Sequence, residues 1–309
     1  MAEVSAKDAM KLRQMTGAGV MDCKKALAEA DGDMDKAVEL LREKGLAKAA
    51  KKADRIAAEG ICATNVSADN QVASIVEVNS ETDFVAKNAD FQQFVSDVAM
   101  QIKTTAPADV DALLNEKFVN SDETISAMLV NKIATIGENI QIRRFARMTG
   151  DLYDYIHNGG GSIIGSMIKL ESADANSDAV KAVAKDLLLQ ITASAPQYVQ
   201  QSDVPAEVIA AEKEVQLNLV KKENAESAKP KPENVLEKIV EGRMRKFAEE
   251  ICLLDQPFVK DPSVTVAKYI AGIGKNIKVV EFARFEKGEG LEKREDDFAA
   301  EIAKMVNKA

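Results

Sequence analysis

Polar residues interrupt a run of apolar ones at positions 72–79, and this pattern predicts a β-strand. A helical pattern begins near Ala89. The nine residues between these two elements, 80–88, have the sequence SETDFVAKN and therefore form a strand-to-helix connection. We expect this connection to present a short polar and aromatic wedge, with the rest of the chain as its scaffold.

The residue types in this connection allow two interpretations. In the structural one, Thr82 or Ser80 caps the helix start, and Asp83 lies near the positive end of the helix dipole. Phe84 would then anchor the following helix in the core. In the functional one, Phe84 is exposed in the free protein and enters a partner. The residue types alone leave both interpretations open.

The first part of the chain predicts a small domain of three short helices. These helices are expected over residues 5–15, 20–30 and 34–44, and are bounded by the caps and breakers Ser5, Gly17, Gly19, Asp33 and Gly45. The following Ala-rich and basic stretch, Lys44 to Arg55, predicts a solvated helical linker, and a basic docking strip is the alternative.

Two stretches of the chain repeat each other at an offset of 137 residues, from position 137 to position 274. IATIGENI at 133–140 matches IAGIGKNI at 270–277, and the sequence FAR follows each copy, at 145–147 and at 282–284. Each copy predicts the end of a helix, a glycine stop and then a strand.

Upstream of each glycine stop, the pattern predicts a pair of hairpin strands and then a helix that ends at Ala-Pro. The strands are expected within 61–78 and 149–170, and the helices run to about Lys103 and over 176–194. This duplication predicts an α+β fold in which each sheet buries one face under its own helices.

The second copy carries an insertion, because its Ala-Pro and glycine stop are 78 residues apart against 30 in the first copy. Two apolar stripes occupy it, at positions 208, 211, 215 and 219 and at 236, 240, 244, 247 and 251, with Lys229–Pro232 as a turn between them. These narrow, charge-flanked stripes predict an antiparallel coiled-coil hairpin, which can contact a partner or a second copy of the chain.

Composition narrows the class of protein. A length of 309 residues with 46% hydrophobic residues predicts about two globular domains. The net charge of -9 argues against direct nucleic-acid binding and favours a protein partner. The three dispersed cysteines suggest neither disulfides nor a zinc site, and no apolar run approaches the ~20 residues of a membrane span. We therefore expect a cytoplasmic protein without a signal peptide or a membrane anchor.

Candidate catalytic chemistry is sparse. His157 is the only histidine, and it lies at a predicted hairpin tip without a nucleophile or carboxylate partner. The glycine-rich residues 159–165 lack the terminal Lys and Ser/Thr of a phosphate-binding loop, so they predict a tight turn. Glu81, Asp83 and Asp90 do not have the spacing of metal ligands. We expect no catalytic residues, no metal, no cofactor and no enzyme activity.

Five sequence motifs resemble the family of bacterial translation elongation factors Ts, which are nucleotide exchange factors of the GTPase EF-Tu. The motifs are LR at 12–13 with TGAGVMDCKKAL at 16–27, EVN at 77–79 with TDFVAKN at 82–88, IGENI at 136–140, EGRM at 241–244 and QPFV at 256–259. They spread over nearly the full length of the chain.

The resemblance implies an architecture. It comprises a UBA-like helical domain with its basic linker (1–55), a first core subdomain (56–147), a related second core subdomain (148–200 and 253–285), an inserted antiparallel coiled-coil hairpin (201–252) and a carboxy-terminal helical module (286–309, with its helix near Phe298 to Val306). This agrees with the pattern of elements described above.

The resemblance also implies a mechanism, in which the protein binds EF-Tu·GDP and promotes GDP release by disturbing the Mg²⁺ and phosphate site. Phe84 would insert beside the switch region and Asp83 would perturb the Mg²⁺ side. The implied EF-Tu-binding and Mg²⁺-dislocating residues are Thr82, Asp83, Phe84 and Val85, with further contacts from Met21, Lys24, Ile136, Gly137, His157 and Val240. A homodimer or a heterotetramer through the coiled coil is a further expectation.

Two other classes of function stay open from the residues alone. The small helical domain followed by basic residues could be a ubiquitin-like or nascent-chain-binding module, in which case the residues before Arg55 would bind a partner alone. An enzyme would have to use Cys23 or His157, and would keep its turnover when the wedge is removed.

Overall fold

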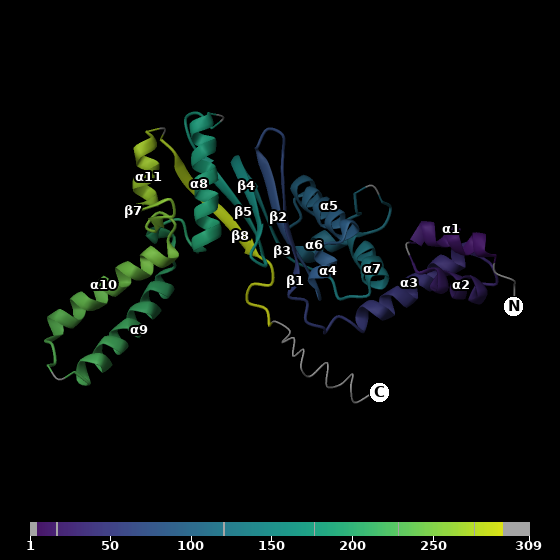
Figure 1. Ribbon diagram of the computed structural model, residues 1–309, viewed down its shortest axis with the longest axis horizontal. Coiled ribbons are helices and arrows are strands. Elements are labelled where there is room, and N and C mark those ends of the chain that lie inside the picture. The colour runs from purple at the N-terminus through teal and green to yellow at the C-terminus, as the bar shows by residue number, and fades with distance from the viewer. Residues whose placement is uncertain are drawn as a thin grey trace.

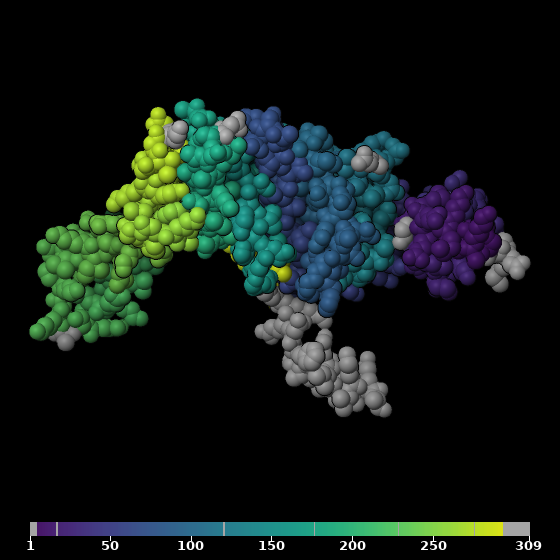
Figure 2. All heavy atoms as spheres, turned by 45° about the horizontal axis from the view of Figure 1, so that its top comes forward, coloured from purple at the N-terminus to yellow at the C-terminus, as the bar shows by residue number. Residues whose placement is uncertain are grey.

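The computed structural model describes residues 5–292 except residues 17, 120, 176, 228 and 275, and it has an α+β fold (Figure 1). The molecule is elongated. The amino-terminal helices lie at one end, a long helical hairpin lies at the other, and two sheets lie between them (Figures 1 and 2). The expected mixture of helices and sheets is confirmed.

Helices α1 (Ala6–Thr16), α2 (Val20–Glu29) and α3 (Met34–Ala50) form the small amino-terminal domain around Leu12 and Leu27, which are fully buried. The Ser5 hydroxyl accepts a hydrogen bond from the N–H of Asp8 at 3.1 Å, and Asp33 caps α3. Both residues therefore act as the predicted helix caps.

The prediction that the third helix stops at Gly45 is wrong, because α3 continues to Ala50. Gly45 is buried, and a Cβ at this position would lie 3.5 Å from Val130 and 3.6 Å from Ala134. The glycine is thus a point where α3 approaches a second helix closely. The last turns of α3 pack on the body of the protein, so the expected solvated linker is in part a packed one.

The first sheet has the strand order β1 (Glu59–Val66), β2 (Val72–Ser80) and β3 (Gln141–Thr149), all antiparallel. Helices α4 (Asp83–Ala86), α5 (Ala89–Thr105), α6 (Val110–Asn115) and α7 (Ile125–Ile136) connect β2 to β3. Phe91 and Phe94 of α5 are the largest fully buried side chains of the core between this sheet and its helices.

The second sheet has the order β4 (Asp151–Gly159), β5 (Ser162–Glu171) and β8 (Lys278–Glu286), again antiparallel. Helices α8 (Asp178–Ser194) and α11 (Val266–Ile273) pack on it, and the 3₁₀ turn Gln201–Asp203 and the small strands β6 (Pro257–Phe258) and β7 (Asp261–Thr265) lie in the connection. Gly160 and Gly161 form the tight turn between β4 and β5, as predicted, with φ of 61° and 83°.

The repeat is visible in the helix ends. Helices α5 and α8 both end at a left-handed alanine before proline, Ala106 and Ala195. Helices α7 and α11 both end at a left-handed glycine, Gly137 and Gly274, before the last strand of their sheet. Both sheets therefore follow the same order of strand pair, helix, glycine stop and strand.

Each sheet buries one face under its own helices, as predicted, and the two sheets also pack against each other, which the sequence does not predict. Ile75, Leu152 and Met167 form a buried cluster between them. Gly165 permits the close approach, since a Cβ there would lie only 2.8 Å from Ile75. Figure 1 shows the resulting order of helix, sheet, sheet and helix. Strand β2 is therefore buried on both faces.

The insertion folds as the antiparallel hairpin of α9 (Ala206–Ala225) and α10 (Glu233–Ile251) (Figure 1). The predicted stripe on α10 faces inward. The stripe predicted on α9 is wrong at Ala211, Val215 and Leu219, which are exposed, whereas Val220 is buried against α10. Polar residues also take part in the interface between α9 and α10; Gln216, for example, accepts a hydrogen bond from Arg243 at 3.3 Å. A search for apolar residues alone therefore could not identify the face of α9 that packs on α10.

Residues 293–309 lie outside the described residues, and so does the helix expected near Phe298 to Val306. Among the helices that the structure describes, none is both long enough and apolar enough to cross a membrane.

Candidate partner-binding site

The wedge is expected over residues 80–88; Ser80 is the last residue of β2, so the wedge consists of residues 81–88 between β2 and α5. Its central part is the short helix α4, and Asn88 caps α5 by accepting bonds from the N–H groups of Asp90 and Phe91. The expectation that Thr82 or Ser80 caps the helix beginning near Ala89 is therefore wrong. Thr82 precedes α4, and its side chain makes no capping bond.

Phe84 is 78% exposed, whereas its neighbours Val85 and Ala86 are each 6% exposed. Val85 belongs to the core under the first sheet, so it and not Phe84 anchors the wedge. The interpretation of Phe84 as a core anchor is thus contradicted. A fully apolar ring held in solvent on a short helix is a surface that a partner can bury.

A reciprocal pair of carboxylates holds the base of the wedge. Glu138 accepts one bond from the N–H of Thr82 at 3.0 Å and one from its hydroxyl at 2.6 Å. In return, Glu81 accepts a bond from the N–H of Asn139 at 2.7 Å. Such charge-assisted bonds are stronger than neutral ones, and they fix the wedge to the loop between α7 and β3.

The exposed side of α4 carries a small electrostatic cluster. Lys87 donates a hydrogen bond to Asp83 at 2.5 Å, and its ammonium lies 5.8 Å from the centre of the Phe84 ring. The hydrogen bond from Lys87 holds the pKa of Asp83 below its usual value, and the charges of Lys87 and Lys287 act in the same direction. The wedge therefore presents an aromatic ring beside a carboxylate that is ionised at neutral pH.

Ile136 and Gly137 lie beside this base, because they directly precede Glu138. Ile136 is half-buried and Gly137 is exposed, with φ of 89° at the end of α7. Met21 and Lys24 are both exposed on α2 in the small domain, away from the wedge (Figure 1). Of these predicted contacts, Ile136 and Gly137 therefore lie next to the wedge, whereas Met21 and Lys24 lie on a separate surface.

The tip of the β4–β5 hairpin lies at the same edge of the sheets as the wedge. The backbone N–H of Lys287 donates to the carbonyl of Ile163, next to the tip, at 3.0 Å. The side chain of Lys287 pairs with Glu59, the first residue of β1. Glu59 in turn lies opposite Ser80, the last residue of β2 before the wedge. His157 belongs to this hairpin; it lies within β4, two residues before its end, and not in the turn as expected. Its ring is 6.3 Å from that of Tyr155.

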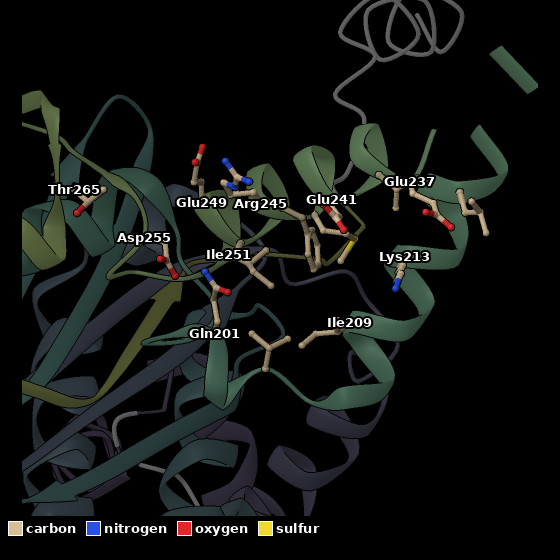
Figure 3. Close-up of a pocket in the computed structure, with 16 residues that line it drawn as sticks. Gln201, Ile209, Lys213, Glu237, Glu241, Arg245, Glu249, Ile251, Asp255 and Thr265 are labelled. Carbon is tan, nitrogen blue, oxygen red and sulfur yellow. The ribbon is translucent and has the colours of Figure 1, made fainter. Parts of the chain in front are cut away.

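Val240 is 3% exposed, and its side chain is packed inside the hairpin against Val220 and Leu236. A groove of about 860 Å³ runs along this part of the hairpin (Figure 3). Glu237, Val240, Glu241 and Met244 are among the residues that line it. In this conformation a partner can contact the groove, but it can reach little of the Val240 side chain itself.

The described residues contain no group of three or more His, Cys, Asp and Glu side chains that could hold a metal ion. All three cysteines are buried and free. Burial raises the pKa of the Cys62 thiol to about 12 and that of Cys252 to about 11. These thiols are poor nucleophiles at neutral pH.

Three residues that hold the wedge are not among the site residues predicted from the sequence: Glu138, Asn139 and Lys87. A signal for Glu138 exists in the repeat, since the matching position of the second copy is Lys275. The two octapeptides also differ at Thr135, which matches Gly272, but only the change at Glu138 reverses a charge, and this indicates that only one copy needs the carboxylate. The described part of the second connection has no short helix and no aromatic residue between β5 and α8.

Comparisons with known proteins identify the family that this chain resembles. Residues 81–289 match the family model described as Elongation factor TS. The chain is 48% identical to Elongation factor Ts of Clostridioides difficile (strain 630), over 99% of this chain and 100% of that protein. It is 47% identical to Elongation factor Ts of Clostridium kluyveri, over 98% and 99%, and 46% identical to that of Clostridium perfringens, over 99% and 100%.

Proposed function

The chain belongs to the elongation factor Ts family, and we propose that residues 82–85 are the element with which it releases GDP from EF-Tu. As a translation elongation factor it exchanges the nucleotide of this GTPase and allows GTP to load. It acts by binding and not by covalent catalysis. Full-length similarity to this family also favours nucleotide exchange over a ubiquitin-like or nascent-chain-binding module.

One observation carries the proposal for the wedge: Phe84 is 78% exposed on a helix whose base is fixed. An apolar ring normally avoids this position, and the bonds from Thr82 to Glu138 keep it there in the free protein. A partner therefore meets a surface that is already ordered and loses little conformational entropy on binding it.

The wedge can act on the nucleotide without touching the base. A GTPase holds its nucleotide through backbone donors around the β-phosphate and through Mg²⁺, so displacing either element weakens binding. In our proposal, Phe84 inserts beside the switch region and Asp83, ionised at neutral pH, disturbs the Mg²⁺ side. Thr82 and Val85 hold these two residues from either side.

Magnitudes show that the wedge needs help from other contacts. A thousandfold faster release requires about 4 kcal/mol, and burial of one Phe side chain supplies ~1.5–3 kcal/mol. We propose that Met21, Lys24, Ile136, Gly137 and His157 supply the remainder, with the hairpin around Val240. Because coupling is reciprocal, GDP and Mg²⁺ must weaken the grip of this protein on EF-Tu by the same factor.

The finer architecture is part of the same proposal. The three amino-terminal helices would form a UBA-like domain, the two three-stranded sheets would be related core subdomains, and residues 201–252 would be the coiled-coil arm. Association into a homodimer or a heterotetramer through this arm stays a prediction, as does the cytoplasmic location.

The proposal is tested by GDP release. EF-Tu carrying a fluorescent GDP is mixed with the protein and excess unlabelled nucleotide, and the release rate is followed against protein concentration. Phe84→Ala should slow release severalfold to about a hundredfold, as expected for loss of ~1–3 kcal/mol at an interface hot spot. Val259→Ala, at another exposed apolar residue, is the matched control. If the two variants release GDP equally fast, the wedge is not the acting element.

A further inference from the structure

The wedge is joined to the small amino-terminal domain through one buried side chain. Asn139 is 2% exposed, and its amide donates bonds to the carbonyls of Arg55 at 2.8 Å and Ala53 at 3.3 Å. These two carbonyls belong to the segment that follows α3. The backbone N–H of the same Asn139 donates to Glu81 in the wedge.

The junction is closed by an ion pair. Arg55 lies 3.5 Å from the same Glu81 oxygen that accepts from Asn139. Lys52 is near enough to Glu81 and Glu138 for their charges to act on its pKa, although burial lowers that pKa overall. The end of the linker, the wedge and the start of β3 therefore meet at one point.

Helix α3 carries this junction rigidly to the small domain. It runs without interruption from Met34 to Ala50, and Ala49 in its last turn packs on the core under the first sheet. Gly45 lets the helix approach α7 closely. A seventeen-residue helix fixed at its carboxyl end places Met21 and Lys24, which lie on the neighbouring helix α2, at a defined position relative to Phe84.

We propose that Asn139 is a positioning residue that sets the small domain relative to the wedge, so that the two surfaces bind EF-Tu as one bivalent unit. This inference rests on the proposed function. When two binding surfaces are linked, the second binds with an effective concentration that depends on how well the link holds its geometry. A loose link reduces this concentration without changing either surface.

The chemistry of Asn139 makes the proposal separable from the wedge itself. Its side chain holds only the linker carbonyls, whereas its backbone N–H holds Glu81. Asn139→Ala therefore removes two of the bonds that hold the linker, leaves the Arg55–Glu81 ion pair and the bond from Gln141 to the carbonyl of Ala53, and keeps both the Glu81 bond and the bonds from Thr82 to Glu138. The wedge should stay ordered while the small domain gains freedom.

Two variants and one control make the test. Asn139→Ala acts at the junction, and Gly45→Leu acts from the other side by displacing α3 from Val130 and Ala134. Gln101→Ala is the matched control, because Gln101 is also a buried amide and donates to the carbonyl of Lys117 at 2.8 Å, within the first core subdomain. All three are compared in the full chain at a temperature where circular dichroism shows them folded.

In the GDP release assay, both variants should raise the concentration for half-maximal release about three- to tenfold and leave the saturated rate nearly unchanged. The control should change neither. Adding Met21→Ala to Asn139→Ala should cost less than it costs in the unmodified chain, because a loosened domain contributes less binding. A loss of folding stability alone would not produce this pattern.

A distance measurement gives a readout independent of exchange. Spin labels on cysteines introduced at the exposed residues Lys36 and Asp122 report the separation between small domain and core. The distance distribution should broaden in both variants and not in Gln101→Ala. If it stays narrow, or if Asn139→Ala lowers the saturated rate as Phe84→Ala does, the positioning role is refuted. If Phe84→Ala itself has no effect, the proposed function fails instead.

Discussion

The carboxylate of Glu138 accepts two hydrogen bonds from Thr82, at 3.0 Å from its N–H and at 2.6 Å from its hydroxyl. The two residues are 56 positions apart in the chain. Their contact fixes the residue that precedes α4, and hence the direction in which Phe84 leaves the surface. The wedge is thus held from the loop after α7, outside its own segment.

Glu138→Ala should therefore loosen the wedge without removing Phe84. Loss of two bonds to a carboxylate predicts a fall of about 1–3 kcal/mol in the free energy of unfolding. GDP release should slow about three- to thirtyfold, because the ring is no longer preorganised. Urea unfolding and the release assay measure the two effects. Glu123→Ala, which removes a bond from Asn131 in the same subdomain, should lower stability only and leave release unchanged.

Much of this fold could be predicted from local signals. The two glycine stops, Gly137 and Gly274, are needed because a left-handed residue ends each helix before a strand, and the sequence repeats them with their flanking residues. The caps Ser5 and Asp33 and the turn at Gly160 follow from equally local chemistry. Each of these features depends on residues that are neighbours in the chain.

The packing of the two sheets could not be predicted in the same way. Ser74 and Glu77 interrupt the apolar run of β2, yet both are fully buried. Ser74 donates to the carbonyl of Ala99 at 2.6 Å, and Glu77 accepts bonds from Arg143 and Arg144. Polar side chains with distant partners resemble surface residues in a sequence, so the pattern predicts a strand but not its burial on both faces.

In the site, too, local features can be predicted from the sequence and long-range contacts cannot. Phe84 was identified as a candidate wedge residue, but its exposure depends on Val85 taking the core position, which residue type alone did not decide. The sequence does not predict Glu138 and Asn139 as site residues, because their partners, Thr82 and Arg55, are more than fifty residues away in the chain. Contacts across such separations leave no periodic pattern.

Phe84→Ala and Phe91→Ala should differ strongly in their effect on stability. The first removes a ring that is 78% exposed and should change the free energy of unfolding by less than about 0.5 kcal/mol. The second empties a fully buried site under the first sheet and should cost about 3–5 kcal/mol. Thermal and urea unfolding measure both. A large loss of stability in Phe84→Ala would mean that the ring packs on the core in solution.

Gly45→Ala should leave the fold intact and stabilise it by up to about 1 kcal/mol, since alanine favours a helix interior and the added Cβ meets Val130 only at 3.5 Å. Gly60→Ala provides the contrast. Gly60 has φ of 125°, and a Cβ there would lie 2.1 Å from the carbonyl oxygen of Val78. That variant should be strongly destabilised. A destabilised Gly45→Ala would show that α3 and α7 are packed more tightly than the structure indicates.

Removal of the hairpin should spare the two sheets. Val220, Leu236 and Val240 form a cluster made only by the hairpin's own residues, so deleting residues 209–246 and closing the gap with a short glycine turn leaves the sheet cores complete. Circular dichroism should lose helical signal and keep one cooperative transition. GDP release should weaken severalfold and not vanish, because the wedge is retained. An unfolded deletion variant would show that the sheets depend on the hairpin.

The last prediction concerns the charge on the wedge. Lys87 donates to Asp83 at 2.5 Å and is the main cause of the lowered pKa of that carboxyl. Lys87→Met keeps most of the aliphatic side chain and removes the ammonium, so the pKa of Asp83 should rise towards its usual value. Carbon-13 NMR titration of the Asp83 carboxyl measures this change. Asp69 is the control, because its pKa is lowered chiefly by a hydrogen bond from Ser67.

The sign of the linked effect follows from the direction of the shift. A carboxyl whose pKa is lower in the folded state stabilises that state above its unfolded pKa, and this contribution is lost as the pH falls through the folded pKa. Between pH 6 and 8 Asp83 is ionised both in the unmodified chain and in Lys87→Met. Its charge therefore does not make GDP release depend on pH in that range. Asp83→Asn should slow release equally across it. A slowing by Asp83→Asn that disappears at one end of this range would show that Asp83 titrates there, and that Lys87 does not hold its pKa low.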